Sequence, residues 1–312
     1  MAPSALTSAP AKRSLWQDLG HSRAFLGFAF MVPAAAILLF FLTYPLGLGV
    51  WLGFTDARLN RPGEFIGFEN YQSLSGDPIF WLSVFNTLLY TIAASIAKFG
   101  LGLWLALILN ENLPFKSFFR AVVLLPWVVP TVLSALAFWW IFDSQFSIIS
   151  WVLIKIGLIS SPINFLGDPT NARLSVIAAN VWRGIPFVAI TLLAGLQTIS
   201  PSLQEAATLD GATSWERFRF ITLPLLTPII AVVMTFSVLF TFTDFQLIWV
   251  LTRGGPLNAT HLMATLSFQR FSSGQLGEGA AIAVAMVPFL LAAILFSYFG
   301  LQRRKWQQGG AD

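Results

Sequence analysis

Long apolar runs alternate with short polar segments along the chain, and this alternation dominates its organisation. A helix needs about 20 consecutive apolar residues to cross the hydrocarbon core of a bilayer. The runs that reach this length cover about residues 25–53, 81–109, 120–142, 174–198, 225–250 and 279–301. The pattern predicts an all-α membrane protein with six transmembrane helices.

Two other segments predict structure outside the bilayer. Residues 146–159 are apolar but too short to cross, and Lys155 interrupts them, so we expect an interfacial helix on the outer side. Residues 254–278 contain several glycines and predict an external loop with room for a short helix. The predicted domains are a cytoplasmic tail at 1–24, a membrane domain at 25–305 and a C-terminal tail at 306–312.

Composition supports a membrane protein and excludes several kinds of site. Of the 312 residues, 56% are hydrophobic and 10% are charged, whereas globular domains carry about a quarter charged residues. Because cysteine is absent, neither a disulfide framework nor a cysteine-ligated metal site is available. His21 and His261 lie near no acidic cluster, so no metal is expected. The apolar run after Arg23 is too long for a cleavable signal peptide.

The distribution of basic residues predicts the orientation. Six spans place both termini on one side, which then holds ten lysines and arginines against six on the other. Basic residues collect on the cytoplasmic side of membrane proteins, so we expect cytoplasmic N- and C-termini. The net charge of +4 is explained by this topology, and no nucleic acid partner is expected.

The polar segment 200–224 lies between two apolar runs and must lie outside the hydrocarbon. It opens with a serine N-cap and a first-turn proline, and Ser202–Glu205 has the spacing of a capping box. Gly211 is expected to stop this first helix, and Thr213–Glu216 offers a second capping box. The segment predicts a helix, a glycine turn and a second helix at the membrane surface.

The same segment resembles the EAA loop of binding-protein-dependent ABC importer permeases. The matching positions are Glu205, Ala206, Ala207, Asp210, Gly211, Ala212, Leu223 and Pro224. In that family the loop is the coupling helix that docks into a groove on the cytoplasmic ATPase. The resemblance implies that the small alanines allow close approach and that Glu205 offers a carboxylate to a basic partner. A capping role for Glu205 is compatible with docking.

Further motifs resemble the carbohydrate-type ABC permeases, in the branch of the maltose and glycerol-phosphate subunits. They are Gly67–Tyr71, Asn86-Thr87, Asn180–Phe187 and Leu251–Pro256. The resemblance covers roughly residues 25–305 and implies the type I importer permease fold in a bacterial inner membrane. It also implies three kinds of partner: a second, different permease chain, two copies of an ABC ATPase and an extracytoplasmic sugar-binding protein.

The chain lacks the phosphate-loop motif G-x-x-x-x-G-K-[ST]. We therefore expect a transport subunit rather than an enzyme, without a cofactor of its own, and with ATP and Mg bound by the partner ATPase. An ion-coupled secondary transporter is the alternative, with Asp244 as its candidate coupling carboxylate. That class leaves the segment 200–224 unexplained. An intramembrane enzyme is disfavoured because no HExxH motif, carboxylate pair or Ser/His pair lies at membrane depth.

Polar side chains inside spans are costly and mark candidate substrate sites. In the fifth span, Ser237, Thr241 and Asp244 recur at spacings of four and three, so they share one helical face. Phe240 flanks them and is suited to stack on a sugar ring. Hydroxyl residues also commonly hold helices together, which explains Ser237 and Thr241 equally well. A carboxylate in lipid has few structural explanations, so Asp244 is the stronger candidate.

The fourth span offers Asn180, Arg183, Gly184 and Phe187. In related sugar permeases these two segments line the translocation cavity, and the resemblance implies substrate binding at all eight positions. The aromatic positions are also ordinary packing residues. Lys98, in the second span, is expected to snorkel or to line the interface between permease chains rather than to contact substrate.

Depth in the bilayer predicts that Arg183 and Asp244 face one cavity and pair when no substrate is bound. At about 1.5 Å per residue, they lie about 25 Å and 30 Å above the cytoplasmic ends of their spans. An unpaired charge there costs about 2.5 kcal/mol or more. Two alternatives stay open: Arg183 snorkels outward while Asp244 binds sugar hydroxyls alone, or Arg183 receives an anionic sugar.

Overall fold

The computed structural model describes residues 23–308, so residues 1–22 and 309–312 of the predicted tails lie outside the described part. The chain divides between Trp51 and Leu52 into two compact units, which are described separately. Both are helical, and the described residues contain isolated β-bridges but no strand. The prediction of an all-α protein is confirmed.

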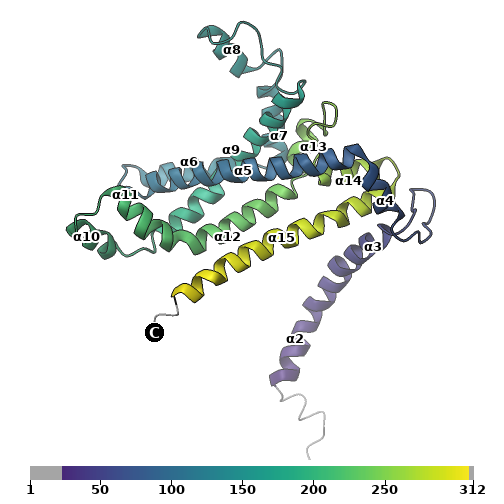
Figure 1. Cartoon of the computed structure of the whole chain (residues 1–312), viewed down its shortest axis with the longest axis horizontal. Helices are drawn as coiled ribbons and strands as arrows, with labels where there is room; N and C mark the ends of the chain where they lie inside the picture. The colour runs from purple at the N-terminus through teal and green to yellow at the C-terminus, as the bar shows by residue number, and fades with distance from the viewer. Residues whose placement is uncertain (1–22, 309–312) are drawn as a thin grey trace, which may run out of the picture. The chain divides into compact units, whose positions relative to one another are not determined.

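The first unit is one long apolar helix (Figure 1). It consists of α2 (Arg23–Leu38), the π-helical segment η1 (Leu39–Thr43) and α3 (Tyr44–Leu52). Pro33 lies inside α2 without ending it. The stretch Phe25–Leu52 is long and apolar enough to cross a membrane, so a helix at the first predicted span is confirmed.

The second unit holds the remaining helices, as Figure 1 shows. Two long helices, α5 (Pro78–Asn110) and α9 (Pro169–Leu196), pack against each other and form its centre. The other elements are α4 (Glu69–Gly76), α6 (Lys116–Val128), α7 (Thr131–Ile141), α8 (Ile148–Lys155), α10 (Pro201–Leu209), α11 (Ser214–Arg217), η2 (Phe218–Thr222), α12 (Leu223–Phe242), α13 (Gln246–Leu251), α14 (Met263–Ser272) and α15 (Leu276–Gln308).

Buried aliphatic side chains hold α5, α9 and α12 together. Ala106, Leu192 and Leu226, one from each helix, are fully buried in this core. Small residues set the spacing, because a Cβ on Gly102 would lie 2.8 Å from Val188 Cγ1. Two further buried clusters join α7 and α13 to α5 and α9, and α14 and α15 to α5.

The span predicted at 120–142 is broken in the structure. Two helices, α6 and α7, replace it and meet at a bend of 90°. Pro130 has no N–H to donate, and its ring favours extended backbone at Val129, which has φ −63° and ψ 129°. The helix therefore stops and restarts in a new direction.

The other predicted spans correspond to helices. Within the described residues, four helices are long and apolar enough to cross a membrane, and the bent pair makes five. Helix α15 contributes a further apolar stretch, Leu276–Ala292, at the sixth predicted position. The fifth span is interrupted between α12 and α13. The short helices expected at 146–159 and within 254–278 are present as α8 and α14.

The loop between α13 and α14 is pinned onto the two central helices. Asn86 donates from Nδ2 to the carbonyls of Asn258 and His261, each at 3.2 Å. Arg173 donates from Nε to Asn86 Oδ1 and to the Ala259 carbonyl, each at 3.0 Å. Side chains of α5 and α9 thus satisfy the loop carbonyls and fix the loop in place.

Candidate functional sites: an internal cavity and a surface helix-turn-helix

A cavity of about 550 Å³ is lined by residues of α5, α6, α7, α9, α12 and α13. Its lining includes all eight positions expected to bind substrate: Asn180, Arg183, Gly184, Phe187, Ser237, Phe240, Thr241 and Asp244. The lining residues that the sequence did not identify as cavity residues are Lys98, Trp127, Thr131, Thr243, Phe245 and Gln246. The structure brings the predicted residues together, and substrate binding by them stays a prediction.

Asp244 lies in the break between α12 and α13 and ties that break to the central helices. Its Oδ2 accepts hydrogen bonds from Tyr90 Oη at 2.7 Å and from Asn180 Nδ2 at 3.0 Å. Its Oδ1 accepts one from the backbone N–H of Leu247, at the start of α13, at 3.4 Å. Neutral donors therefore stabilise the carboxylate. Nothing in the apolar run around Tyr90 indicates this contact.

Arg183 faces the cavity and rests on an aromatic ring. Its guanidinium carbon lies 5.7 Å from the centroid of the Trp127 ring, within the range of a cation–π contact. The predicted sharing of one cavity with Asp244 is confirmed. The predicted pair does not form as a direct contact, because the described residues include no ion pair between them within 4.0 Å. Asp244 uses neutral donors instead.

Lys98 is 4% exposed, and its ammonium points into the protein. Its Nζ donates to Thr241 Oγ1 at 2.5 Å, so the expectation that it snorkels is wrong. The alkyl chain passes over Gly184, where an added Cβ would lie 2.3 Å from Lys98 Cδ. Gly184 thus has a steric role: its missing side chain leaves room for the lysine to reach the cavity.

Aromatic rings form one wall of the cavity. Trp127 and Phe187 stack with their centroids 5.0 Å apart, and Phe240 lies 6.3 Å from Phe187. Phe240 is nevertheless 56% exposed in this chain. The predicted packing role is confirmed at these positions, and stacking on a sugar ring stays a prediction. The sequence did not identify Trp127 as a cavity residue, because its placement depends on the direction of the bend between α6 and α7.

Three buried polar atoms of cavity residues have no hydrogen-bond partner among the described residues. They are Arg183 Nε, Asn180 Oδ1 and Ser237 Oγ. A buried polar group without a partner costs about 1–3 kcal/mol, and most such groups in proteins are satisfied by protein, water or ligand. The cavity therefore offers unmet donors and acceptors to a polar molecule.

The segment 200–224 folds as a surface helix-turn-helix. Gly211 has φ +82°, a left-handed conformation that favours glycine, and it separates α10 from α11. The predicted box at Thr213–Glu216 is confirmed: Glu216 N–H donates to Thr213 Oγ1 at 3.3 Å, and Thr213 N–H donates to Glu216 Oε2 at 2.7 Å. The N–H and hydroxyl of Thr213 lower the pKa of the Glu216 carboxyl.

The box predicted at Ser202–Glu205 does not form. Helix α10 begins at Pro201, so Ser200 is its N-cap and Ser202 lies inside the first turn. The hydroxyls of the two serines lie 2.8 Å apart. Glu205 therefore has no capping partner here and is exposed.

The positions matched to the EAA loop lie mostly on the surface. Glu205, Ala206, Asp210, Gly211 and Pro224 are exposed, whereas Ala207, Ala212 and Leu223 are half-buried. A second cavity of about 500 Å³ lies under this segment, and its lining includes Glu111, Glu205 and Arg217. An exposed helix-turn-helix presents a surface on which another protein can dock.

The comparisons with known proteins bear on both sites. The family described as "Binding-protein-dependent transport system inner membrane component" matches residues 98–307, which include the whole segment 200–224 and all the residues that line the first cavity. The chain belongs to this family. It is therefore a transport subunit of an inner membrane, and not an enzyme.

Relatives of this membrane component match over most of their length. The trehalose/maltose transport system permease protein MalF of Thermococcus litoralis is 35% identical over 293 residues, which cover 93% of this chain and 99% of the relative. The sulfoquinovosyl glycerol transport system permease protein SmoG of Agrobacterium fabrum is 37% identical over 276 residues, covering 87% and 88%. The alternative of a secondary transporter receives no support from these matches.

Solved structures confirm the permease fold. A bacterial ABC transporter that imports the acidic polysaccharide alginate has a chain that matches with a TM-score of 0.80 at 26% identity, covering 93% of this chain and 98% of that one. The alginate transporter in complex with its alginate pentasaccharide-bound periplasmic protein matches with a TM-score of 0.77 at 26% identity, covering 91% and 95%.

Proposed function

We propose that this permease subunit forms half of the translocation pathway of an ATP-driven importer for a carbohydrate. The observation that carries the proposal is the cavity, where unmet hydrogen-bonding groups face a wall of aromatic rings. The relatives named for trehalose and maltose, for sulfoquinovosyl glycerol and for alginate support a carbohydrate as cargo.

The chemistry of the cavity suits a sugar. Sugar rings have apolar faces, which pack well on aromatic rings such as Trp127, Phe187 and Phe240. Sugar hydroxyls both donate and accept, so they can supply partners to Asn180 Oδ1 and Ser237 Oγ. The substrate-binding role of these cavity residues is part of the proposal.

Coupling is assigned to the exposed segment 200–224, which we propose docks on a cytoplasmic ATPase. The matched positions are those given above, with Glu205 as the carboxylate that meets a basic partner and Gly211 as the turn. ATP and Mg are then bound by that ATPase, and this chain needs no cofactor. Two ATPase copies, a second and different permease chain and an extracytoplasmic binding protein complete the importer. Both termini and the segment 200–224 then lie in the cytoplasm of a bacterial cell.

The experiment is reconstitution into liposomes with and without partners. We expect the chain alone to accumulate no sugar, and the complete importer to accumulate sugar only with ATP inside and binding protein outside. The matched control is the complete importer with an ATPase that binds but does not hydrolyse ATP. ATP-independent accumulation by this chain alone would contradict the proposal and support a secondary transporter.

A further inference from the structure

The charged groups of the cavity differ in how many hydrogen bonds they make. The lining contains two cations, Lys98 and Arg183, and one carboxylate, Asp244. The carboxylate accepts three hydrogen bonds from neutral donors. Lys98 has one acceptor, Thr241 Oγ1, whereas Arg183 Nε has none in the described part of the chain. The cavity therefore has an excess of positive charge and of unused N–H donors.

The two cations are brought to the same wall by the packing of α5 against α9. The alkyl chain of Lys98 crosses α9 at Gly184, which directly follows Arg183 in the chain. The guanidinium of Arg183 lies over the ring of Trp127. Neither cation has a carboxylate within 4.0 Å among the described residues. An ammonium has three donors and a guanidinium has five, so most of these donors are available to a ligand.

We propose that the cavity takes a carbohydrate that carries an acidic group, and that Lys98 and Arg183 bind that group. The inference rests on the proposed function and narrows its substrate class to sugars with a carboxylate, sulfonate or phosphate. An oxyanion accepts charge-assisted hydrogen bonds from both side chains and supplies the missing partner of Arg183 Nε. A neutral sugar leaves the buried ammonium of Lys98 and the half-buried guanidinium of Arg183 without a counter-charge beyond the single carboxylate of Asp244.

The test measures equilibrium binding to the complete importer in nanodiscs, with the binding protein left out so that only the membrane site contributes. The probes are maltose and a glucuronosyl-glucose disaccharide, which has a carboxylate in place of one hydroxymethyl group. We expect the acidic disaccharide to bind at least about 10-fold more tightly, as one charged hydrogen bond implies. Inorganic sulfate is a third probe and is expected to bind more weakly than the acidic sugar.

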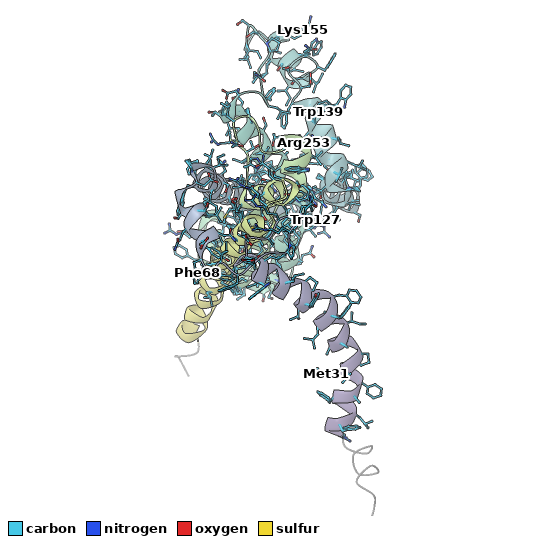
Figure 2. All side chains as sticks on the ribbon, turned by 90° about the vertical axis from the view of Figure 1, so that its right-hand side faces the viewer. Met31, Phe68, Trp127, Trp139, Lys155 and Arg253 are labelled. Carbon is cyan, nitrogen blue, oxygen red and sulfur yellow. The ribbon has the colours of Figure 1, made fainter. Side chains whose placement is uncertain are left out.

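Substitutions assign the preference to residues. Arg183→Gln and Lys98→Gln are each expected to weaken binding of the acidic disaccharide about 10- to 100-fold and of maltose less than about threefold. Arg183→Lys keeps the charge and should keep the preference for the acid, which separates loss of charge from misfolding. Lys155→Gln is the matched control: this exposed lysine lies on α8, well away from Trp127 and the crowded centre of the second unit (Figure 2). The Lys155→Gln substitution should change neither the affinity for the acidic disaccharide nor that for maltose.

Each contrary outcome has a defined meaning. The proposal of an acidic sugar is overturned if maltose binds as tightly as the acidic disaccharide or more tightly. It is also overturned if Arg183→Gln weakens the binding of both sugars equally, or if neither sugar binds. Sulfate that competes as strongly as the acidic disaccharide overturns the assignment to a carbohydrate. Uptake by the same complex is measured in parallel: ATP-dependent import of neutral sugars alone leaves the proposed function standing, whereas no ATP-dependent import of any carbohydrate overturns that function as well.

Discussion

Tyr90 and Asp244 are 154 positions apart in sequence and joined by a hydrogen bond of 2.7 Å, which links α5 to the break between α12 and α13. Tyr90 is 2% exposed, so water does not compete for the contact. The bond is charge-assisted and therefore stronger than one between neutral groups. It fixes the carboxylate at the cavity wall and, with Asn180, orients the start of α13.

Removal of this hydroxyl should destabilise the protein. We expect Tyr90→Phe to lower the free energy of unfolding by about 1.5–3 kcal/mol, because a charged acceptor loses a buried donor. Tyr71→Phe is the matched control, since the Tyr71 hydroxyl is buried and has no hydrogen-bond partner among the residues that the structure describes. Its loss should cost less than about 0.5 kcal/mol. Denaturant unfolding of the purified importer measures both, and equal losses would contradict a special role for Tyr90.

Gly184 should tolerate no side chain while Lys98 is present. A Cβ there would lie 2.3 Å from Lys98 Cδ, so Gly184→Ala is expected to displace the lysine from Thr241 and to reduce transport. Shortening the lysine removes the clash. The double variant Gly184→Ala, Lys98→Ala should therefore be more stable than Gly184→Ala alone, a non-additivity that denaturant unfolding detects.

The control for the Gly184 and Lys98 variants is Gly100→Ala, which lies on the central helix α5. A Cβ at Gly100 meets nothing within 4 Å, and alanine favours helix over glycine by about 1 kcal/mol. We expect unchanged transport and equal or higher stability. A clash at Gly184 is refuted if Gly184→Ala behaves as Gly100→Ala does.

The residues of the cavity were largely predictable because polar side chains stand out in apolar runs. Spacings of three and four place Ser237, Thr241 and Asp244 on one face, and the face is where the cavity lies. Lys98 and Trp127 were not predicted as cavity residues, since their placement depends on how α5 packs on α9 and on the bend after α6. Pro130 accounts for a break after α6, but neither the direction of the bend nor the packing of α5 on α9 can be read from local sequence.

The predicted Arg183–Asp244 pair shows the limit of a depth argument. The rise per residue gives the height of each side chain in the bilayer, but contact also depends on the direction in which the side chain points. Tyr90 and Asn180 donate hydrogen bonds to Asp244, and the guanidinium of Arg183 lies over the Trp127 ring instead. Short-range signals predicted the capping box at Thr213–Glu216 correctly but failed at Ser202–Glu205, because α10 begins at Pro201 and places Ser202 inside the first turn.

The turn at Gly211 provides a test of coupling to the ATPase. Gly211 has φ +82° and open space around it, so Gly211→Val strains the backbone by about 1–2 kcal/mol without a steric clash. We expect the variant to insert in the membrane but to lose copurification with the ATPase, or to hydrolyse ATP without transport. Glu205→Lys should do the same by reversing the docking charge.

A matched control for the backbone strain lies on another loop. Gly157, two residues after the end of α8, has φ +77° and also has nothing within 4 Å of an added Cβ. Gly157→Val therefore introduces the same strain away from the segment 200–224 and should leave ATPase copurification intact. Normal copurification and transport in both Gly211→Val and Glu205→Lys would exclude a docking role for this segment.

His261 makes the loop between α13 and α14 sensitive to acid. The residue is 2% exposed, and its ring lies against Gly254, where a Cβ would come within 2.2 Å of His261 Cε1. Burial lowers the pKa of His261 from 6.5 to about 4. Below pH 6.5, His261 is protonated when the loop is open, whereas in the closed loop it stays neutral down to about pH 4. The closed loop is thus fully stable above pH 6.5 and loses stability between pH 6.5 and 4.

Hydrogen exchange of the loop amides at residues 252–262 measures this loss. After correction for the intrinsic pH dependence of exchange, we expect protection to fall between pH 6.5 and 4, by up to about 3 kcal/mol of opening free energy, and to level off below pH 4. His261→Gln does not titrate, so it should abolish the change within this window even where it lowers protection overall. Amides of α8 in the same sample are the internal control. Protection of the wild-type loop that stays constant from pH 8 to pH 4 would show that the imidazole is not held neutral by the contacts of this loop.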